Sequence, residues 1–300
     1  MKYHISVHIS PYEIDNYQTF IHQLRRNLNY TEGCDIIFTP MLNLSPYFYN
    51  WDKSTLSKDF FIDKFKSLND IVSSKCNLFE FINEEEKILG AFSYKTMFLK
   101  EFKNKVDAFI WFDSDMIFPD NTISSLISAY ESVEDKHCII TPQIHRLWDN
   151  TWEVLVNKDY MGGKASHANY FGFDSYSLFK IKDRDLSVIK NENRFKFGAG
   201  WCNLLSSDLF KDYIDFTYNL GHYGPDDTFI MLLLDHYKFN KNKNINQYII
   251  KNLVITENYK YSINPYDTLI EKNQNIKSKK DFTNEVTTEI NKVINKVYKQ

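Results

Sequence analysis

The chain has 300 residues, of which 43% are hydrophobic and 25% are charged, and its 36 basic and 39 acidic side chains give a net charge of -3. A chain of this size and composition buries a large core without needing disulfides or metals to fold. An aromatic content of 16% excludes a disordered chain. The slight acidic excess argues against a protein that coats nucleic acid.

The cysteines are far apart and none forms a CxxC pair, which argues against a zinc site. We expect free, buried thiols in a reducing compartment and therefore a cytoplasmic protein. The amino terminus has no apolar segment typical of a signal peptide. The longest apolar runs, such as Phe229–Leu234, are much shorter than the ~20 residues of a membrane-spanning helix. The four cysteines are Cys34, Cys76, Cys138 and Cys202.

Strand patterns alternate with helix patterns over the first half of the chain. We expect Asp15 to cap the first helix and Pro40 to end the second strand. In chain order, the predicted elements are a strand over Tyr3–Ile9, a helix over Tyr17–Leu28, a strand over Asp35–Thr39, a loop over 41–58, a helix over Phe60–Val72, a strand over Asn77–Ile82, a helix over Glu84–Phe102, a strand over Val106–Phe112, a helix over Asn121–Tyr130 and a strand over Cys138–Thr141.

This order predicts an α/β fold with a mostly parallel central sheet flanked by helices. Residues 145–195 have no clear period, and we expect loops and irregular strands there. Further along, the predicted elements are a strand over Gly198–Leu205, a helix that begins at 206–208, a helix from Asp226 or Asp227 to His236, a strand over Tyr248–Thr256 and a helix from Asp281 onward.

The last of these helices carries an apolar stripe from Phe282 to Val297. We expect the stripe to pack on the rest of the chain, and a homodimer through this helix is the alternative. The predicted organisation is one catalytic domain over 1–265 and a helical extension over 266–300.

The most informative segment is Asp113-Ser114-Asp115, which directly follows the apolar run Val106–Phe112. Ligands of open α/β sheets bind at the carboxyl ends of strands. Two carboxylates placed there suit a Mg²⁺ or Mn²⁺ ion on a diphosphate. A solvated turn that caps the next helix is the structural alternative.

Two later segments complete a pattern: Phe197–Trp201, which contains Gly198 and Gly200, and Gly224–Phe229, which contains Asp226 and Asp227. Together with Asp113-Ser114-Asp115, and in this order, they resemble the motifs of nucleotide-sugar-dependent glycosyltransferases of the GT-A fold, especially those of family 2. The resemblance covers roughly residues 1–260, and its specificity comes from order and strand context.

The resemblance implies that Asp113, Ser114 and Asp115 bind the donor nucleotide, with Asp113 near the ribose or a metal-bound water and Asp115 on the metal. It implies that Asp227 is the general base that takes the proton of the acceptor hydroxyl, which favours inversion. Asp226, Gly200 and Trp201 would contact the acceptor. For Asp226 and Asp227, helix capping is the structural alternative.

The chain departs from the family at two places. The family often has a third metal ligand, usually His, about thirty residues beyond the base, where this chain has Glu257. We expect Glu257 to take that place, and His236 to be structural. No residue convincingly matches the family's nucleobase site.

Two residues near these motifs are expected to be structural. Trp111 lies inside the apolar run and should belong to the core. Lys95, on the helix that precedes the acidic strand, should be a solvated lysine.

The sequence therefore predicts a metal-dependent glycosyltransferase that uses Mn²⁺ or Mg²⁺. Its donor would be a nucleoside-diphosphate sugar, and its acceptor a hydroxyl of a glycan, a lipid-linked molecule or a protein. Two alternatives stay open: a nucleotidyltransferase that makes a nucleotide sugar, and a non-catalytic carbohydrate-binding relative. The first is disfavoured because no glycine follows the first strand at Ser10-Pro11-Tyr12, where a phosphate loop is expected. The second would be expected to have lost one of the acidic motifs.

Overall fold

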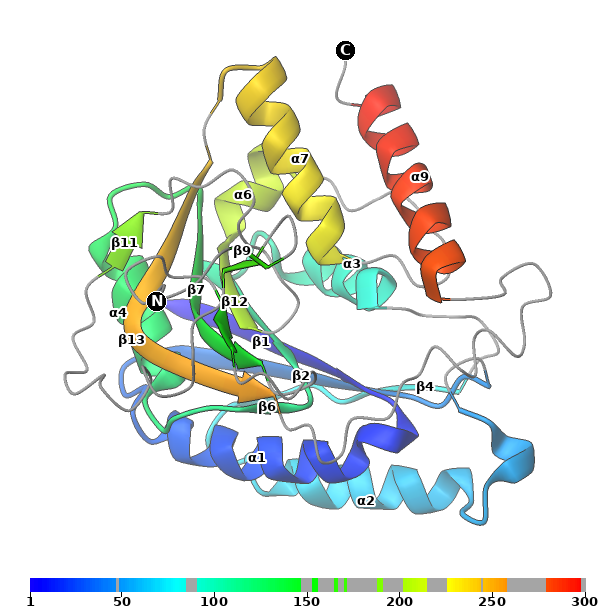
Figure 1. The fold of residues 1–300 in the computed structure, drawn as a ribbon. Coiled ribbons are helices and arrows are strands. Elements are labelled where there is room, and N and C mark those ends of the chain that lie inside the picture. The colour runs from blue at the N-terminus through cyan, green and yellow to red at the C-terminus, as the bar shows by residue number, and fades with distance from the viewer. Residues whose placement is uncertain are drawn as a thin grey trace.

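The computed structural model describes residues 1–46, 49–84, 91–146, 153–155, 165–166, 170–171, 188–190, 202–214, 226–243, 245–257 and 279–297. In this part of the chain, helices cover both faces of a central sheet (Figure 1). The predicted α/β class is confirmed.

The central sheet has eleven strands in the described part of the chain, and seven of them run in one direction: β1, β2, β3, β4, β5, β7 and β13. The main path of the sheet is β11-β13-β7-β12-β5-β1-β2-β3. β12 runs antiparallel between β5 and β7. The strands are β1 (Lys2–Ile9), β2 (Asp35–Asn43), β3 (Asn77–Leu78), β4 (Phe81–Asn83), β5 (Ala108–Asp113), β6 (Met116–Ile117), β7 (Cys138–Arg146), β8 (Glu153–Leu155), β11 (Val188–Lys190), β12 (Cys202–Ser206) and β13 (Asn246–Glu257), with β9 (Ala165–Ser166) and β10 (Tyr170–Phe171) in a separate pair.

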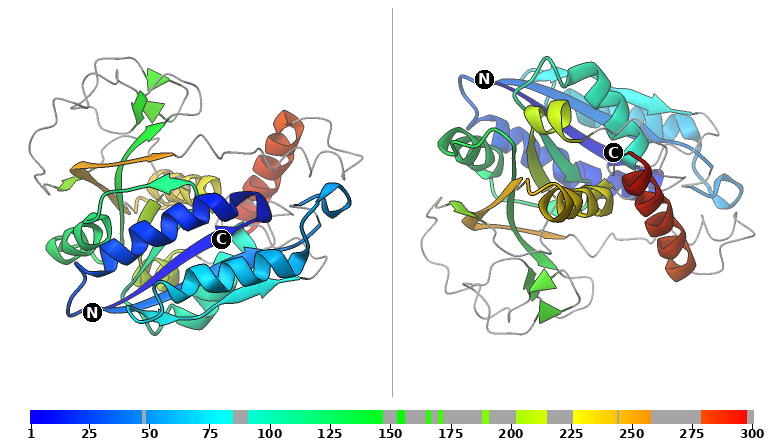
Figure 2. Two further views of the ribbon diagram at one scale, coloured as in Figure 1. Left: turned by 90° about the horizontal axis from the view of Figure 1, so that it is seen from below. Right: turned by 90° about the horizontal axis from the view of Figure 1, so that it is seen from above.

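The helices fall into two layers, one on each side of the sheet (Figure 2). Buried side chains of α1, α2 and α4 belong to one hydrophobic cluster, and those of α3, α6, α7 and α9 belong to the other. The helices are η1 (Pro11–Glu13), α1 (Ile14–Leu28), η2 (Trp51–Lys53), α2 (Lys58–Asp70), α3 (Ala91–Phe102), α4 (Thr122–Ser132), α6 (Ser207–Asp212), α7 (Asp226–Asn240) and α9 (Lys279–Val297).

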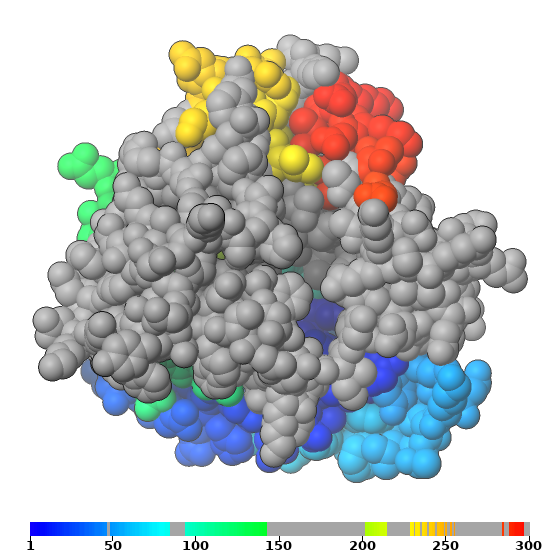
Figure 3. Space-filling model, in the orientation of Figure 1, coloured from blue at the N-terminus to red at the C-terminus, as the bar shows by residue number. Residues whose placement is uncertain are grey.

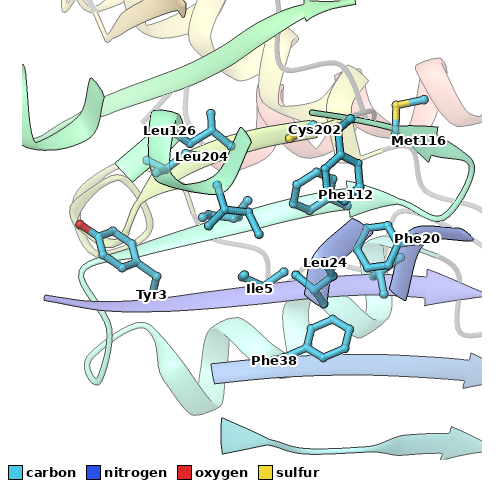
Figure 4. Close-up of a cluster of buried hydrophobic side chains, with 14 of the residues drawn as sticks. Tyr3, Ile5, Phe20, Leu24, Phe38, Phe112, Met116, Leu126, Cys202 and Leu204 are labelled. Atoms are coloured by element: carbon cyan, nitrogen blue, oxygen red, sulfur yellow. The ribbon is translucent and has the colours of Figure 1, made fainter. Parts of the chain in front are cut away.

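The two clusters follow from side-chain alternation along the strands. Tyr3 and Ile5 of β1 point to the α1 side, where Phe20 and Leu24 pack (Figure 4). Val7 belongs to the same cluster. Trp111, at 2% exposure, lies in the other cluster, so its predicted place in the core is confirmed. Because β5 is covered on both faces, it reads as a nearly continuous apolar run in the sequence. β1 is covered on both faces too, but it alternates apolar residues with the buried polar residues His4 and Ser6.

The carboxy-terminal helix α9 packs beside α7 (Figure 3). Ile290 and Ile294 are 0% and 5% exposed and belong to the same cluster as Phe229 and Leu233 of α7. The predicted packing on the rest of the chain is confirmed for this part of the stripe, and the side chains of Phe282, Val286 and Val297 lie outside the described part.

Strand β2 is longer than predicted, since it continues through Pro40 to Asn43. Phe79 N–H donates to Phe38 O, so Pro40, two residues along the strand, faces the same edge. The edge pairing is interrupted there between Leu78 and Phe81. The missing N–H of the proline therefore costs no ladder hydrogen bond.

Two other expectations are wrong. The predicted strand Asn77–Ile82 is two short strands, β3 and β4. Asp15 lies within the first turn of α1 and pairs with Lys64 at 2.7 Å, so it does not cap the helix. The predicted helix Glu84–Phe102 is confirmed over Ala91–Phe102, and residues 85–90 lie outside the described part.

Candidate functional site

The acidic segment lies where the sequence predicts it, at the carboxyl end of a central strand. β5 ends at Asp113, and Ser114 and Asp115 form the turn into β6. Ile110, Trp111 and Phe112 before it are at most 2% exposed, whereas both aspartates are partly exposed. The two carboxylates thus lie at the carboxyl end of a buried central strand. They are beside the end of β1, where the strand order reverses.

Glu13 joins this turn to the end of β1. Its Oε2 accepts hydrogen bonds from Ser10 N at 2.7 Å and from Ser10 Oγ at 2.8 Å. Its Oε1 accepts one from Ser114 Oγ at 2.9 Å. Burial raises the pKa of Glu13, and the hydrogen bonds from Ser10 and Ser114 oppose that rise. The Ser-x-x-Glu capping pattern of Ser10 and Glu13 is readable in the sequence, but its contact with Ser114 is not.

Two further polar residues of α1 hold the segment that follows the turn. Gln23 Oε1 accepts a hydrogen bond from Phe118 N at 2.6 Å. Asn27 Nδ2 donates to Pro119 O at 2.9 Å, and its Oδ1 accepts from Ile123 N at 3.0 Å. These backbone N–H and C=O groups lie outside the strands of the sheet, and side chains of α1 provide hydrogen bonds for them instead.

β13 brings Glu257 beside the acidic turn. β6 pairs antiparallel with the end of β13 (Figure 1). In that pairing Glu257 lies opposite Met116, the residue after Asp115. Glu257, the predicted third metal ligand, therefore lies close along the backbone to Asp115, although the two residues are 142 positions apart in the sequence.

A polar chain crosses the carboxyl ends of β1, β2 and β4. Asn43 Nδ2 donates to His8 Nε2 at 3.1 Å, and Asn83 Nδ2 donates to Asn43 Oδ1 at 2.9 Å. The His8 ring stacks on Tyr94 with centroids 5.1 Å apart. Burial and then the charge of Lys95 lower the pKa of His8 to about 3, so this ring is neutral near pH 7. His8 lies beside Asp113 in the β1–β5 register.

The prediction that Lys95 is solvated is wrong, because its side chain is 1% exposed. Its Nζ lies 4.6 Å from the ring centroid of Trp111, within cation–π range. A helical pattern does not distinguish this position from a solvated one, because α3 turns this lysine toward the sheet. The buried cation is a functional candidate, although its sequence context favoured a solvated lysine.

The remaining predicted site residues are only partly described. Asp226 and Asp227 are the first two residues of α7, and their side chains lie outside the described part, as do Gly200 and Trp201. His236 is 6% exposed and bonds Asn240 through Nδ1 at 2.8 Å, as a structural histidine would.

Carboxylate oxygens are the ligands that Mg²⁺ and Mn²⁺ prefer, and Asp113, Asp115 and Glu257 supply that chemistry. Among the side chains that the structure describes, no three acidic, histidine or cysteine groups are close enough together to hold a metal ion. The side chain of Glu257 is not among them.

All four cysteines are free. Cys138 and Cys202 are buried as predicted, whereas Cys34 and Cys76 are partly exposed. No helix in the described ranges combines the length and the apolar character needed to cross a membrane.

No protein-family model matches the chain, and no curated protein is similar to it. Solved structures show a distant similarity. S. aureus TarS is 11% identical, with 99% of this chain and 72% of that chain covered and a TM-score of 0.45. A UDP-glucose pyrophosphorylase complexed with UDP-glucose is 12% identical, with 99% and 100% covered and a TM-score of 0.42. GalNAc-T7 with UDP, GalNAc and Mn²⁺ is 10% identical, with 99% and 56% covered and a TM-score of 0.44. At these identities and scores, function has to be inferred from the residues of this chain.

Proposed function

We propose that this chain is a glycosyltransferase that transfers a sugar from a nucleoside-diphosphate sugar to an acceptor hydroxyl. One observation carries the proposal: Asp113 and Asp115 stand partly exposed at the carboxyl end of the buried strand β5, beside the reversal of strand order at β1. That is where open α/β sheets bind nucleotides. The resemblance of the three sequence motifs to the GT-A family supports the same reading.

In this proposal Asp113, Asp115 and Glu257 hold Mn²⁺ or Mg²⁺, with Asp113 also near the ribose. When bound, the ion neutralises charge on the diphosphate leaving group. The β6–β13 pairing supports the choice of Glu257, since it sets this residue opposite Met116.

Asp227 is the proposed general base. It takes the proton of the acceptor hydroxyl as that oxygen attacks the anomeric carbon, and the configuration at that carbon inverts. Asp226, Gly200 and Trp201 are proposed to orient the acceptor, which is a glycan, a lipid-linked molecule or a protein. Four free thiols support a reducing, cytoplasmic location.

Metal-dependent nucleotide binding tests the proposal directly. We would measure thermal shifts with UDP, GDP, CDP and TDP, each with Mn²⁺, Mg²⁺ or EDTA. A nucleotide at 100 times its Kd should stabilise the fold by about 2.7 kcal/mol. The expected result is a shift with at least one diphosphate that EDTA abolishes. No shift with any of them would refute the proposal in favour of a non-catalytic protein, and a preference for triphosphates would favour a nucleotidyltransferase.

Asp115→Asn should abolish the metal-dependent shift because it removes a charged ligand. Asp120→Asn is a matched control: Asp120 lies five residues further along and bonds Arg26 at 2.7 Å on the surface. It should bind nucleotide as the wild type does. Equal loss in both variants would contradict the assignment of Asp115.

A further inference from the structure

Glu13 makes more contacts than its place at the start of a helix requires. In a capping box, the glutamate accepts a hydrogen bond from the backbone N–H of the capping residue, and here Oε2 does so from Ser10. The other oxygen, Oε1, accepts from Ser114, a residue 101 positions away. One carboxylate therefore bridges the turn after β1 and the turn after β5.

The contact falls at the residue between the two aspartates. Ser114 is 1% exposed, so its side chain points inward, while Asp113 and Asp115 on either side stay partly exposed. Removing either partner of such a buried hydrogen bond costs free energy, because the other partner is left unsatisfied. Glu13 thereby restrains the peptide units that join the two carboxylates.

A second restraint acts at the far end of the same segment. Gln23 accepts a hydrogen bond from Phe118 N, three residues beyond Asp115. β6 lies between the two restraints and pairs with β13 at Glu257. The acidic turn is thus held to the α1 layer at Ser114 and again just beyond it, at Phe118.

We propose that Glu13 is a positioning residue: through Ser114 it holds Asp113 and Asp115 in the arrangement that binds the cation and the nucleoside diphosphate. This inference rests on the proposed function of that turn. Residues that orient metal ligands typically change metal affinity about 10- to 100-fold when they are removed.

Glu13→Ala, Ser114→Ala and the double variant test the bridge. Each single variant should weaken Mn²⁺-dependent binding by about 10- to 100-fold, measured with the nucleoside diphosphate that gives the wild type its largest thermal shift. The double variant should be no weaker than the worse single variant, because both changes break the same hydrogen bond. Glu13→Gln keeps an acceptor for Ser10 N and a donor for Ser114 Oγ, so it should recover most of the affinity.

Asn69→Ala is the matched control for general destabilisation. Asn69 is fully buried on α2 and bonds Tyr17 and Glu80, away from the acidic turn. It should lower stability without weakening nucleotide binding. If Asn69→Ala weakened binding as much as Glu13→Ala, or if Glu13→Ala bound nucleotide within twofold of the wild type, the proposal would be overturned.

Hydrogen exchange of the metal-free protein supplies a readout that needs no ligand. The amides of residues 114–118 should exchange about tenfold faster in Glu13→Ala and Ser114→Ala than in the wild type. In Asn69→Ala they should exchange at the wild-type rate. Faster exchange with no nucleotide binding by the wild type would refute the proposed function while leaving the restraint in place. Unchanged exchange would refute the restraint itself, whatever the wild type binds.

Discussion

His4 should make the stability of this protein sensitive to acid. Its ring is fully buried among Phe98, Phe102 and Phe109, and stacks on Phe102 with centroids 4.6 Å apart. Nε2 bonds Thr39 Oγ1 at 3.0 Å, while Nδ1 has no hydrogen-bond partner among the described residues. Burial lowers the pKa of His4 to about 3 from its usual 6.5, so the folded protein excludes the proton that the unfolded chain accepts.

Linkage between protonation and folding sets the sign and the size of the change in unfolding free energy. The contribution of His4 is complete above pH 6.5 and is lost progressively as the pH falls toward 3. Between pH 7 and pH 5 the unfolded histidine gains most of a proton and the folded one does not, which destabilises the fold by about 2 kcal/mol. That is a large part of a typical stability of about 5–15 kcal/mol.

Urea unfolding of the wild type and of His4→Phe, at pH 7 and pH 5, measures this term. Phenylalanine suits the aromatic surroundings and does not titrate, so the variant should lose about 2 kcal/mol less than the wild type between the two pH values. His22→Gln is the control, because His22 is exposed on α1, and it should behave as the wild type does. An equal loss of stability in the wild type and His4→Phe would refute the reasoning.

Four further outcomes are expected. Asp227→Asn should keep metal-dependent nucleotide binding and lower sugar transfer by ~10² to 10⁴, as measured by nucleotide release; normal transfer would remove the general-base assignment. Ile290→Ala should cost about 2–5 kcal/mol in urea unfolding, since Ile290 is fully buried between α9 and α7; no cost would mean that α9 does not pack there. Cys138 should resist iodoacetamide at pH 8 until the protein unfolds, because burial raises the pKa of its thiol to about 12; rapid alkylation of the native protein would contradict this. Lys95→Met should raise the pKa of His8 in an NMR titration, because the lysine charge lowers it; an unchanged pKa would mean that Lys95 lies too far away to matter.

Elements whose side-chain period is strong were predictable from the sequence. The alternating apolar residues of β1, the apolar run of β5 and the helical stripe of α1 appear close to their predicted positions. The apolar run of β5 also predicted that Asp113, Ser114 and Asp115 follow the end of a buried strand, and β5 ends at Asp113. These features depend on neighbouring residues alone.

Contacts between distant segments were not predictable in this way. Pro40 remains inside β2 because the edge pairing breaks beside it, and Lys95 is buried because α3 turns it toward Trp111. Neither feature can be predicted from the residues that neighbour it in the sequence.

The candidate site divides along the same line. By itself the sequence determined which strand carries the two aspartates, since a run of apolar residues makes a buried strand and ends where charge begins. Only the tertiary structure brought Glu13 to Ser114 and Glu257 to Met116. Those pairs depend on the order in which strands join the sheet, and that order is decided by the packing of whole layers rather than by the period of any one segment.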